Sequence, residues 1–458
     1  LGNQGNPAAL PALEALKGNR LRISDDGVLI ILNESGDKGR NALSEKQVDL
    51  KSLNLRKPRI NNSVRRVLSS TIGKLQLQSS DPNIRLAAAE QLLKKSSSGL
   101  VELVEKALVK ETSDEIREVF FLVLAKEGLK SDDKKKRLQS LKIIKEFGNN
   151  DFKNVLENLL RKNEKGEFLE SDSEVRDSAK KAISSIERRQ FFIDQIANLF
   201  YGMSLGSILL LAALGLAITF GLMGVINMAH GEMLMIGAYS TFVIQNLFKE
   251  FLPNLFDWYL IAAIPTAFIV SGVVGIIMER SVIRHLYGRP LETLLATWGI
   301  SLVLIQTVRL IFGAQNVEVA NPSYLSGGIQ AFNGVVLPFN RIAIIIFVVF
   351  VVILVWTLLQ KSSLGLQVRA VTQNRGMASC VGISTRKIDM YTFGLGSGVA
   401  GLGGVALSQV GNVGPELGQL YIVDSFMVVV LGGVGKISGT VAGAMGLGVL
   451  NKFLEPVA

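Results

Sequence analysis

Hydrophobic and polar residues are distributed very differently in the two parts of this 458-residue chain. Up to about residue 190, apolar residues recur at helical spacing in short segments that alternate with polar connections. From residue 195 onward, long apolar stretches dominate, and about 20 consecutive apolar residues are enough to cross a bilayer. The pattern predicts a soluble helical domain over 1–190 and a membrane domain over 195–458.

Eight apolar stretches of the membrane domain are candidate spans, of which the last two are short and rich in glycine. They are predicted at 202–224, 233–248, 259–278, 293–312, 341–359, 390–410, 421–435 and 439–454. The fold class that follows is all-α, a polytopic α-helical membrane protein with an N-terminal soluble domain. The sequence starts at Leu1 rather than Met and ends without a polar tail, so we expect further residues beyond both ends.

Basic residues orient the spans, because cytoplasmic loops carry an excess of lysine and arginine. One basic cluster lies between the third and fourth predicted spans, and another lies between the fifth and sixth. The members are Arg280, Arg284 and Arg289, then Lys361, Arg369, Arg375, Arg386 and Lys387. Two loops separated by two spans fall on the same side, so both are predicted to be cytoplasmic. Counting back three spans places residues 1–190 outside the cytoplasm, unless the second span is re-entrant.

The soluble part contains one predicted β-hairpin and a series of short helices. Residues 20–37 alternate around an Asp-Asp-Gly turn, which is typical of a hairpin, and the stretch up to about residue 62 is expected to be loop. Three later helices begin alike, with Asp81, Asp114 and Asp172 shortly ahead of an arginine. This recurring start is typical of a HEAT-like α-solenoid, which would offer a partner-binding surface. An ordinary helical domain explains it equally well.

Composition narrows the function classes. The chain has 65 charged residues in 1–194 and 23 in 195–458, and the first part mixes both signs too evenly for a nucleic-acid-binding patch. The single cysteine, Cys380, excludes an intrachain disulfide, and no zinc or iron–sulfur spacing occurs. We therefore expect no nucleic-acid partner, no metal and no cofactor in this chain.

Two glycine-rich motifs imitate nucleotide-binding loops. Residues 396–401 have the spacing of the dinucleotide fingerprint, but they lie inside an apolar run, where small residues four apart favour close helix packing. Residues 431–439 resemble a phosphate loop, but the first required glycine is missing and Ile437 replaces the hydroxyl residue. The sequence therefore predicts no ATPase site, and a transporter subunit rather than an enzyme.

Polar side chains interrupt the first apolar region at VINMAHGEMLMIGAY, residues 225–239. The segment holds Asn227, His230 and Glu232, and ionisable groups inside a membrane are costly. On a helix, residues two apart point in different directions, and two isolated ligands do not make a metal site. The three side chains could satisfy freed backbone groups at a broken helix, contact a permeant or relay protons. The first interpretation is preferred.

A second polar group lies in the apolar span 291–316. Thr293, Thr297 and Ser301 are four residues apart and share one helix face, and Trp298 and Gln306 belong to the same span. Uncharged hydroxyl and amide groups suit a small neutral permeant that forms hydrogen bonds. Hydrogen bonding between helices explains each of these residues at least as well.

Four motifs together resemble the permease family of branched-chain amino acid and amide ABC importers. They are GLAITFGLMGVINMAHGEMLMIGAY, ETLLATWGISL with GAQN, ALSQVGNVGPELGQLYIVDSFMVVVLGGVGKISG, and NKFLEP. The similarity covers about 200–456 and is greatest to urea permease subunits. The helical domain resembles the extracytoplasmic extension of those subunits.

The resemblance implies a machine of several subunits in a bacterial-type inner membrane. This chain would form the pathway with a second permease, two cytoplasmic ATPases that use the ATP, and a periplasmic substrate-binding protein. The first candidate substrate is a small neutral molecule such as urea, and branched-chain amino acids or short amides are the alternatives. A gradient-driven transporter or channel acting alone, and a membrane-anchored scaffold, are rivals from other classes.

The basic loop 361–389 is the expected coupling segment. It carries a predicted short apolar helix at 376–381, which could enter a groove on a cytoplasmic partner. NRGMASCVGIS is similar to the family segment that meets the ATPase, although it departs from the usual Glu-Ala-Ala consensus. The residues implied in coupling are Arg369, Arg375, Ala378 and Gly382.

Overall fold

The computed structural model describes residues 9–455 apart from 34–37, 43–45, 49, 51–52, 59, 95–100, 165 and 333–334. The chain divides into two compact units, Leu1–Phe191 and Phe192–Ala458. One 51-residue helix, α8 (Ser173–Met223), contributes its first residues to unit 1 and the remainder to unit 2.

Unit 1 begins with helix α1 (Leu10–Lys17) and a small antiparallel sheet of strand order β4-β3-β2-β1-β5. The predicted hairpin is confirmed: β1 (Leu21–Ser24) pairs with β2 (Leu29–Leu32) across a turn that contains Gly27 with φ +78°. Ala15, Leu21 and Ile31 form a small core between α1 and the sheet.

The expectation of a loop up to residue 62 was wrong, and with it an all-α description of unit 1. This stretch forms β3 (Gly39–Asn41), β4 (Gln47–Val48) and β5 (Leu55–Arg56), which extend the hairpin on both sides. Strands of two or three residues are too short to show an alternating pattern, so only their pairing with β1 and β2 identifies them.

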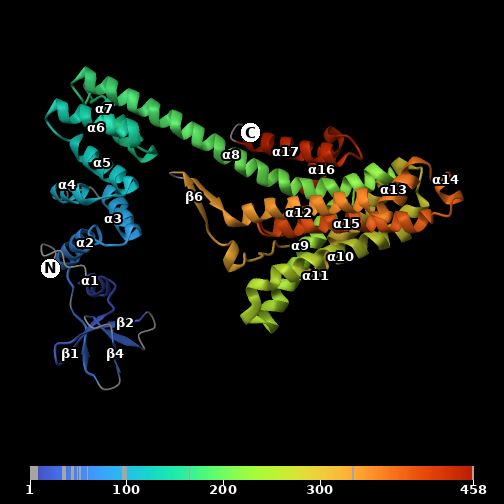
Figure 1. Ribbon diagram of the computed structural model, residues 1–458, viewed down its shortest axis with the longest axis horizontal. Helices are drawn as coiled ribbons and strands as arrows, with labels where there is room; N and C mark the ends of the chain where they lie inside the picture. The colour runs from blue at the N-terminus through green and yellow to red at the C-terminus, as the bar shows by residue number, and fades with distance from the viewer. Residues whose placement is uncertain are drawn as a thin grey trace. The chain divides into compact units, whose positions relative to one another are not determined.

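Helices follow the sheet, as Figure 1 shows. They are α2 (Asn62–Gln76), α3 (Pro82–Lys94), α4 (Val101–Lys110), α5 (Asp114–Gly128), α6 (Lys134–Phe147), the 3₁₀ turn η4 (Asn150–Phe152) and α7 (Lys153–Leu160). Two apolar clusters hold them together, one around Phe120 and the other around Ile144.

A structural signature recurs where α3, α6 and α8 begin. The start of α5, where the sequence predicted Asp114 to share it, has Ser113 as N-cap with no side-chain cap hydrogen bond, so Asp133 of α6 takes its place. Asp81, Asp133 and Asp172 each accept a hydrogen bond from the backbone N–H two residues later, at 2.8–2.9 Å. The arginine four residues after each aspartate donates to the two carbonyls just before that aspartate; these are Arg85, Arg137 and Arg176. The HEAT-like architecture stays a prediction, and this repeated contact supports it.

Two of these arginines also pair with a glutamate that precedes a later helix. Arg85 forms a bidentate pair with Glu111 through two hydrogen bonds. Arg137 donates one hydrogen bond from Nη2 to Glu170, and its Nε lies 3.1 Å from the same carboxylate in an ion pair. Glu111 and Glu170 are buried, and charge-assisted pairs of this kind are stronger than neutral hydrogen bonds. The hydrogen bond from Arg85 holds the pKa of Glu111 below its ordinary value.

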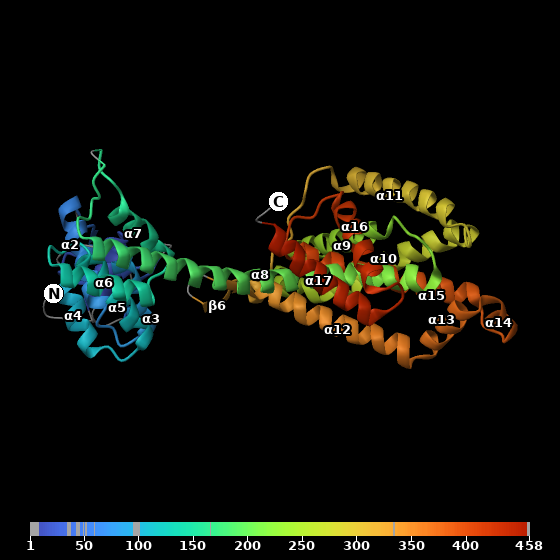
Figure 2. The same ribbon diagram turned by 90° about the horizontal axis from the view of Figure 1, so that it is seen from above.

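Unit 2 is a helical bundle, and each of the eight apolar stretches predicted from the sequence forms a helix there (Figures 1 and 2). After α8 these are α9 (His230–Phe251), α10 (Tyr259–Ser281), α11 (Pro290–Phe312), α12 (Phe339–Lys361), α15 (Thr385–Ser408), α16 (Leu417–Gly432) and α17 (Ile437–Leu454). Six helices, counting α8 but not α9 and α16, are long and apolar enough to cross a membrane.

Shorter elements connect these helices. They are the 3₁₀ turns η5 (Pro253–Trp258), η6 (Ile283–His285) and η7 (Ser323–Leu325), the hairpin of β6 (Gly328–Phe332) and β7 (Val335–Pro338), and helices α13 (Ser363–Gln373) and α14 (Arg375–Cys380). The hairpin precedes α12, whereas α13 and α14 follow it.

The centre of unit 2 is formed by α9, α10 and α15, which pack closely on one another. A Cβ on Gly237 of α9 would collide with the backbone of Gly401 in α15, and one on Gly398 would collide with Phe268 of α10. The glycine-rich run therefore serves close packing inside a helix, as predicted, and no strand precedes it there. The apolar window of α15 is 83% buried, whereas that of α12 is 28% buried.

The two basic loops meet at one end of unit 2. Arg375, at the start of α14, lies 4.7 Å from the ring of Tyr287, which connects α10 to α11. Thr372 of α13 donates to the carbonyl of Leu222 near the end of α8, at 2.8 Å. We call this the basic end, and the starts of α10 and α12 lie at the opposite end.

Candidate functional site

The α8–α9 turn lies in the interior of unit 2. α8 ends at Met223, Gly224 adopts φ +68°, and α9 begins at His230. Asn227, His230 and Glu232 are all essentially inaccessible to solvent. A helix break inside a membrane domain frees backbone groups that need partners, because no water is there to bind them.

Two of these side chains bind backbone groups, one at the end of the turn and one in α8. The Asn227 side-chain oxygen accepts a hydrogen bond from the N–H of Ala229, at 3.1 Å. Nε2 of His230 lies 3.0 Å from the carbonyl oxygen of Ala212 in α8. A carbonyl can only accept, so Nε2 carries the hydrogen and Nδ1 does not in the neutral ring. His230 therefore joins the start of α9 to α8.

Helix α11 is joined to the same turn through two hydroxyl groups. Oγ of Ser301 donates to the Glu232 carboxylate at 2.9 Å, and Oγ1 of Thr297 accepts from the N–H of Met228 at 3.0 Å. Thr293 binds the backbone of Leu286 and Arg289, where α11 begins. The predicted hydroxyl face of α11 thus points inward, against the turn.

The other two pathway candidates in α11 lie elsewhere on the helix. Trp298 is 52% exposed, and Gln306 is exposed as well. Figure 2 shows α11 at the margin of the bundle, and only 22% of its apolar window is buried. The structure therefore brings Asn227, His230, Glu232, Thr297 and Ser301 together, but not Trp298 or Gln306.

Three buried side-chain atoms of the turn have no hydrogen-bond partner among the described residues. They are Nδ2 of Asn227, Nδ1 of His230 and Oε2 of Glu232. His230 and Glu232 face α8 and α11 respectively, as the spacing of two predicts, and do not form a pair. No group of three metal-ligating side chains occurs in the described part of the chain.

The expected coupling segment forms α13 and α14 and the start of α15. Arg375 binds the carboxylate of Asp389 in α15 through both terminal nitrogens, and Asp389 is buried. Arg369 donates to the carbonyl of Leu359 at the end of α12. Both arginines thus hold elements of this chain together, although Arg375 also keeps 45% of its side chain exposed.

The remaining coupling candidates frame α14. Ala378 is buried, and Gly382 follows the helix with φ +87°, which favours glycine. Met377, Val381 and the free thiol residue Cys380 are exposed on and after the same helix. α14 therefore presents an apolar outer surface while its inner side is fixed to α15.

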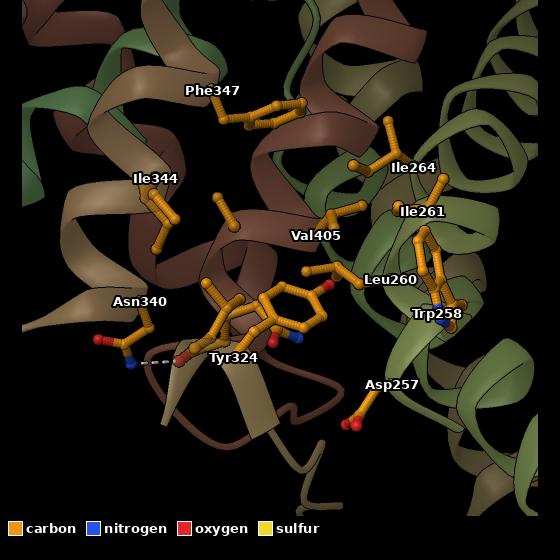
Figure 3. A pocket seen from close by; sticks show the side chains of 14 residues that line it. Asp257, Trp258, Leu260, Ile261, Ile264, Tyr324, Asn340, Ile344, Phe347 and Val405 are labelled. Atoms are coloured by element: carbon orange, nitrogen blue, oxygen red, sulfur yellow. Dashed lines mark hydrogen bonds between the residues drawn. The ribbon is translucent and has the colours of Figure 1, made fainter. Parts of the chain in front are cut away.

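Sequence reasoning missed a polar cluster at the opposite end. Tyr259 donates to the carbonyl of Ala320 at 2.6 Å and accepts from the Gln409 amide at 3.1 Å. Asn340 donates to the carbonyl of Gln409 at 2.9 Å, as Figure 3 shows. These residues lie more than 60 positions apart in sequence, so no local pattern relates them. The only local signal is that Asn340 and Gln409 are amides at the ends of apolar runs.

This cluster borders a cavity of about 610 Å³ between α10, α12 and α15 (Figure 3). Its walls are mostly aliphatic and aromatic, with Leu260, Ile264, Ile344, Phe347 and Val405 among them. A cavity with apolar walls and a few polar groups is a typical setting for a small organic ligand.

Comparisons with known proteins cover mainly unit 2. The family model described as branched-chain amino acid transport system / permease component matches residues 198–458. The high-affinity branched-chain amino acid transport system permease protein BraD of Pseudomonas aeruginosa is 33% identical over 269 residues, which are 57% of this chain and 86% of BraD. The protein LivH of Escherichia coli K12, which has the same description, is 31% identical over 275 residues, 58% of this chain and 87% of LivH.

A more distant relative is the ribose import permease protein RbsC of Haemophilus influenzae, 23% identical over 281 residues, 60% of this chain and 81% of RbsC. No solved structure matches the chain significantly. The first 197 residues lie outside the family match.

Proposed function

Because this chain belongs to the branched-chain amino acid transport system permease family, we propose that it forms half of the membrane pathway of an ATP-driven importer. A second permease supplies the other half, two ATPases the energy, and a substrate-binding protein the solute. The observation that carries this proposal is the family match over all of unit 2 except its first six residues.

Branched-chain amino acids are the first candidate substrates. The relatives BraD and LivH are described as permeases for them. The cavity at the opposite end supports this assignment, because its aliphatic walls suit a branched side chain and its amide and phenol groups suit polar ends.

Urea is the second candidate, and the N-terminal unit favours it. BraD is already aligned over 86% of its length, so too little of it remains to match the first 197 residues. The chain therefore differs from these relatives in a whole domain, and that domain resembles the extension of urea permeases. The substrate can differ as well.

The α8–α9 turn acts as a fixed part of the pathway wall in this proposal. Ser301 and Thr297 each form a hydrogen bond with the turn, and His230 forms one with α8. Side chains engaged in this way hold helices in register, which favours the structural role over permeant contact or a proton relay.

The basic end faces the cytoplasm and receives the ATPases, as the positive-inside rule indicates. Because α8 reaches the basic end at Leu222, its apolar part begins at the opposite end. Tyr201, near that beginning, donates to the carbonyl of Val336 in β7, which precedes α12. Chain continuity supports our proposal that unit 1 lies outside the cytoplasm.

Uptake of labelled leucine and labelled urea by proteoliposomes tests the proposal. They should hold the full complex purified from its host, with its binding protein outside and ATP inside. We expect ATP-dependent accumulation of one of the two solutes, and the identity of that solute decides between the candidates. Equal uptake with and without ATP would contradict the importer and favour a channel.

A further inference from the structure

A second cavity opens at the basic end of unit 2, away from the α8–α9 turn. It measures about 670 Å³ and lies between α8, α12, α13 and the start of α17. Leu214, Ile218, Val352, Trp356 and Val441 are among its apolar walls. We call it the basic-end groove.

The charges of the groove have one sign. Among the residues that line it, Arg369 and Lys436 are charged, and none is acidic. Gln360 and Ser438 add an amide and a hydroxyl next to them. An apolar groove that is also lined by cations and hydrogen-bond donors is complementary to an anionic amphiphile.

Both cations are held at the groove by the backbone around them. Arg369 donates to the carbonyl of Leu359, which fixes its guanidinium beside the end of α12. Lys436 follows Gly435, which has φ +82° and lies so close to Gly221 of α8 that a Cβ on either glycine would crowd the other. Lys436 is exposed, so a ligand can reach it from outside the protein.

We propose that the basic-end groove binds an anionic phospholipid, with acyl chains along α8 and α12 and the phosphate at Lys436 and Arg369. The flanking helix α12 is largely apolar and only 28% buried, so lipid reaches it directly. Basic pockets between membrane helices at the cytoplasmic side are suited to anionic headgroups. The proposal depends on membrane embedding and is independent of which solute is transported.

Trp356 reports on occupancy from inside the groove. The chain has three tryptophans, so replacing Trp258 and Trp298 by phenylalanine leaves Trp356 as the only indole. The full chain is placed in nanodiscs with equal mole fractions of either brominated phosphatidylglycerol or brominated phosphatidylcholine. We expect the anionic lipid to quench Trp356 at least about twofold more strongly, because Lys436 and Arg369 attract its charged headgroup to the groove.

Charge variants separate a specific groove from general attraction. Lys436→Gln should reduce the preference, and Lys436→Gln with Arg369→Gln should abolish it. Lys361→Gln is the matched control, because Lys361 ends α12, which flanks the groove, but does not line the groove itself. This control should leave the preference for the anionic lipid unchanged. Equal quenching by the two lipids in the parent protein would overturn the proposal, as would quenching by neither, which would show that protein covers the groove.

Discussion

Glu232 shows how a single buried side chain can position a helix. α11 has little buried apolar surface, so its polar contacts with the α8–α9 turn contribute a large share of its attachment to the bundle. The Glu232 carboxylate and the Ser301 hydroxyl form one of these contacts, inside the protein and away from water. Leaving a buried polar group without its partner costs about 1–3 kcal/mol.

Glu232→Ala should therefore destabilise the protein chiefly by loosening α11, by about 1–3 kcal/mol. Glu232→Gln keeps an acceptor oxygen for Ser301 and should lose much less. Thermal unfolding of the detergent-solubilised full chain measures both, and Ser301→Ala combined with each variant tests whether the effects share one contact. A Glu232→Ala protein of normal stability with altered substrate selectivity would show permeant contact instead.

Glu111 provides a pH test in unit 1. Its pKa lies below the ordinary 4.5 because Arg85 hydrogen-bonds the ionised carboxylate. A lowered folded-state pKa stabilises the protein above the unfolded value, and this contribution disappears as the pH falls through the lowered pKa.

Glu111→Gln should therefore lower the free energy of unfolding of unit 1 at pH 7. The difference in stability between variant and parent should shrink as the pH is lowered through 4.5 and below. Hydrogen exchange of α3 and α5 in the full chain, compared between the variant and the parent, measures this. A difference that stays constant over the whole range would contradict the assignment of the pKa shift to Arg85.

At the scale of elements, the clearest feature is the attachment of α14 to α15 and to the connection between α10 and α11. Arg375 binds Asp389 of α15 and stacks on Tyr287, which in turn donates to the buried carboxylate of Glu279, at 3.4 Å. Three elements thus meet under a six-residue helix that is too short to be stable alone. We infer that this connection transmits movement of α14 to α10 and α15.

Arg375→Gln or Asp389→Asn should release α14, and the native Cys380 allows this to be measured. A spin label on Cys380 in the full chain should become clearly more mobile in either variant. The exchanged pair Arg375→Asp with Asp389→Arg should restore much of the order, and Arg386→Gln, at an exposed position, is the control. Unchanged spectra in the single variants would show that the pair does not hold α14.

Elements with a clear local pattern could be predicted from the sequence, whereas contacts between distant segments could not. The eight hydrophobic helices, the first hairpin and the hydroxyl face of α11 all follow from local periodicity. The strands β3 to β5 are too short for a pattern, and the Tyr259–Gln409–Asn340 cluster joins residues from three distant segments. The ion pair of Arg375 was likewise hidden, because an isolated arginine in a basic loop looks solvent-exposed.

At the scale of the whole molecule, the proposed function makes unit 2 a membrane conduit that is driven from its basic end. The family match covers unit 2, and both basic loops gather at one end of that unit. Unit 1 has its own sheet and apolar clusters and lies outside the family match. The repeated contacts of Arg85, Arg137 and Arg176 with backbone carbonyls support the prediction of an α-solenoid.

Deletion of residues 1–190 separates a partner-binding role of unit 1 from transport. If unit 1 receives the binding protein, the truncated complex should keep its ATPase subunits but lose stimulation by binding protein, with uptake reduced at least about tenfold. Co-purification and uptake measure the two effects. Loss of the ATPase subunits would instead place unit 1 on the cytoplasmic side.

The most direct test of the central claim is ATP-driven uptake by the reconstituted complex before and after a bulky, membrane-impermeant maleimide has reacted with Cys380. This cysteine is exposed on α14, and it is the only cysteine in the chain. Uptake should stop when the reagent is on the side that holds ATP, continue when it is on the other side, and persist in Cys380→Ser. Uptake that needs no ATP, or that stops only with reagent on the ATP-free side, would contradict the account.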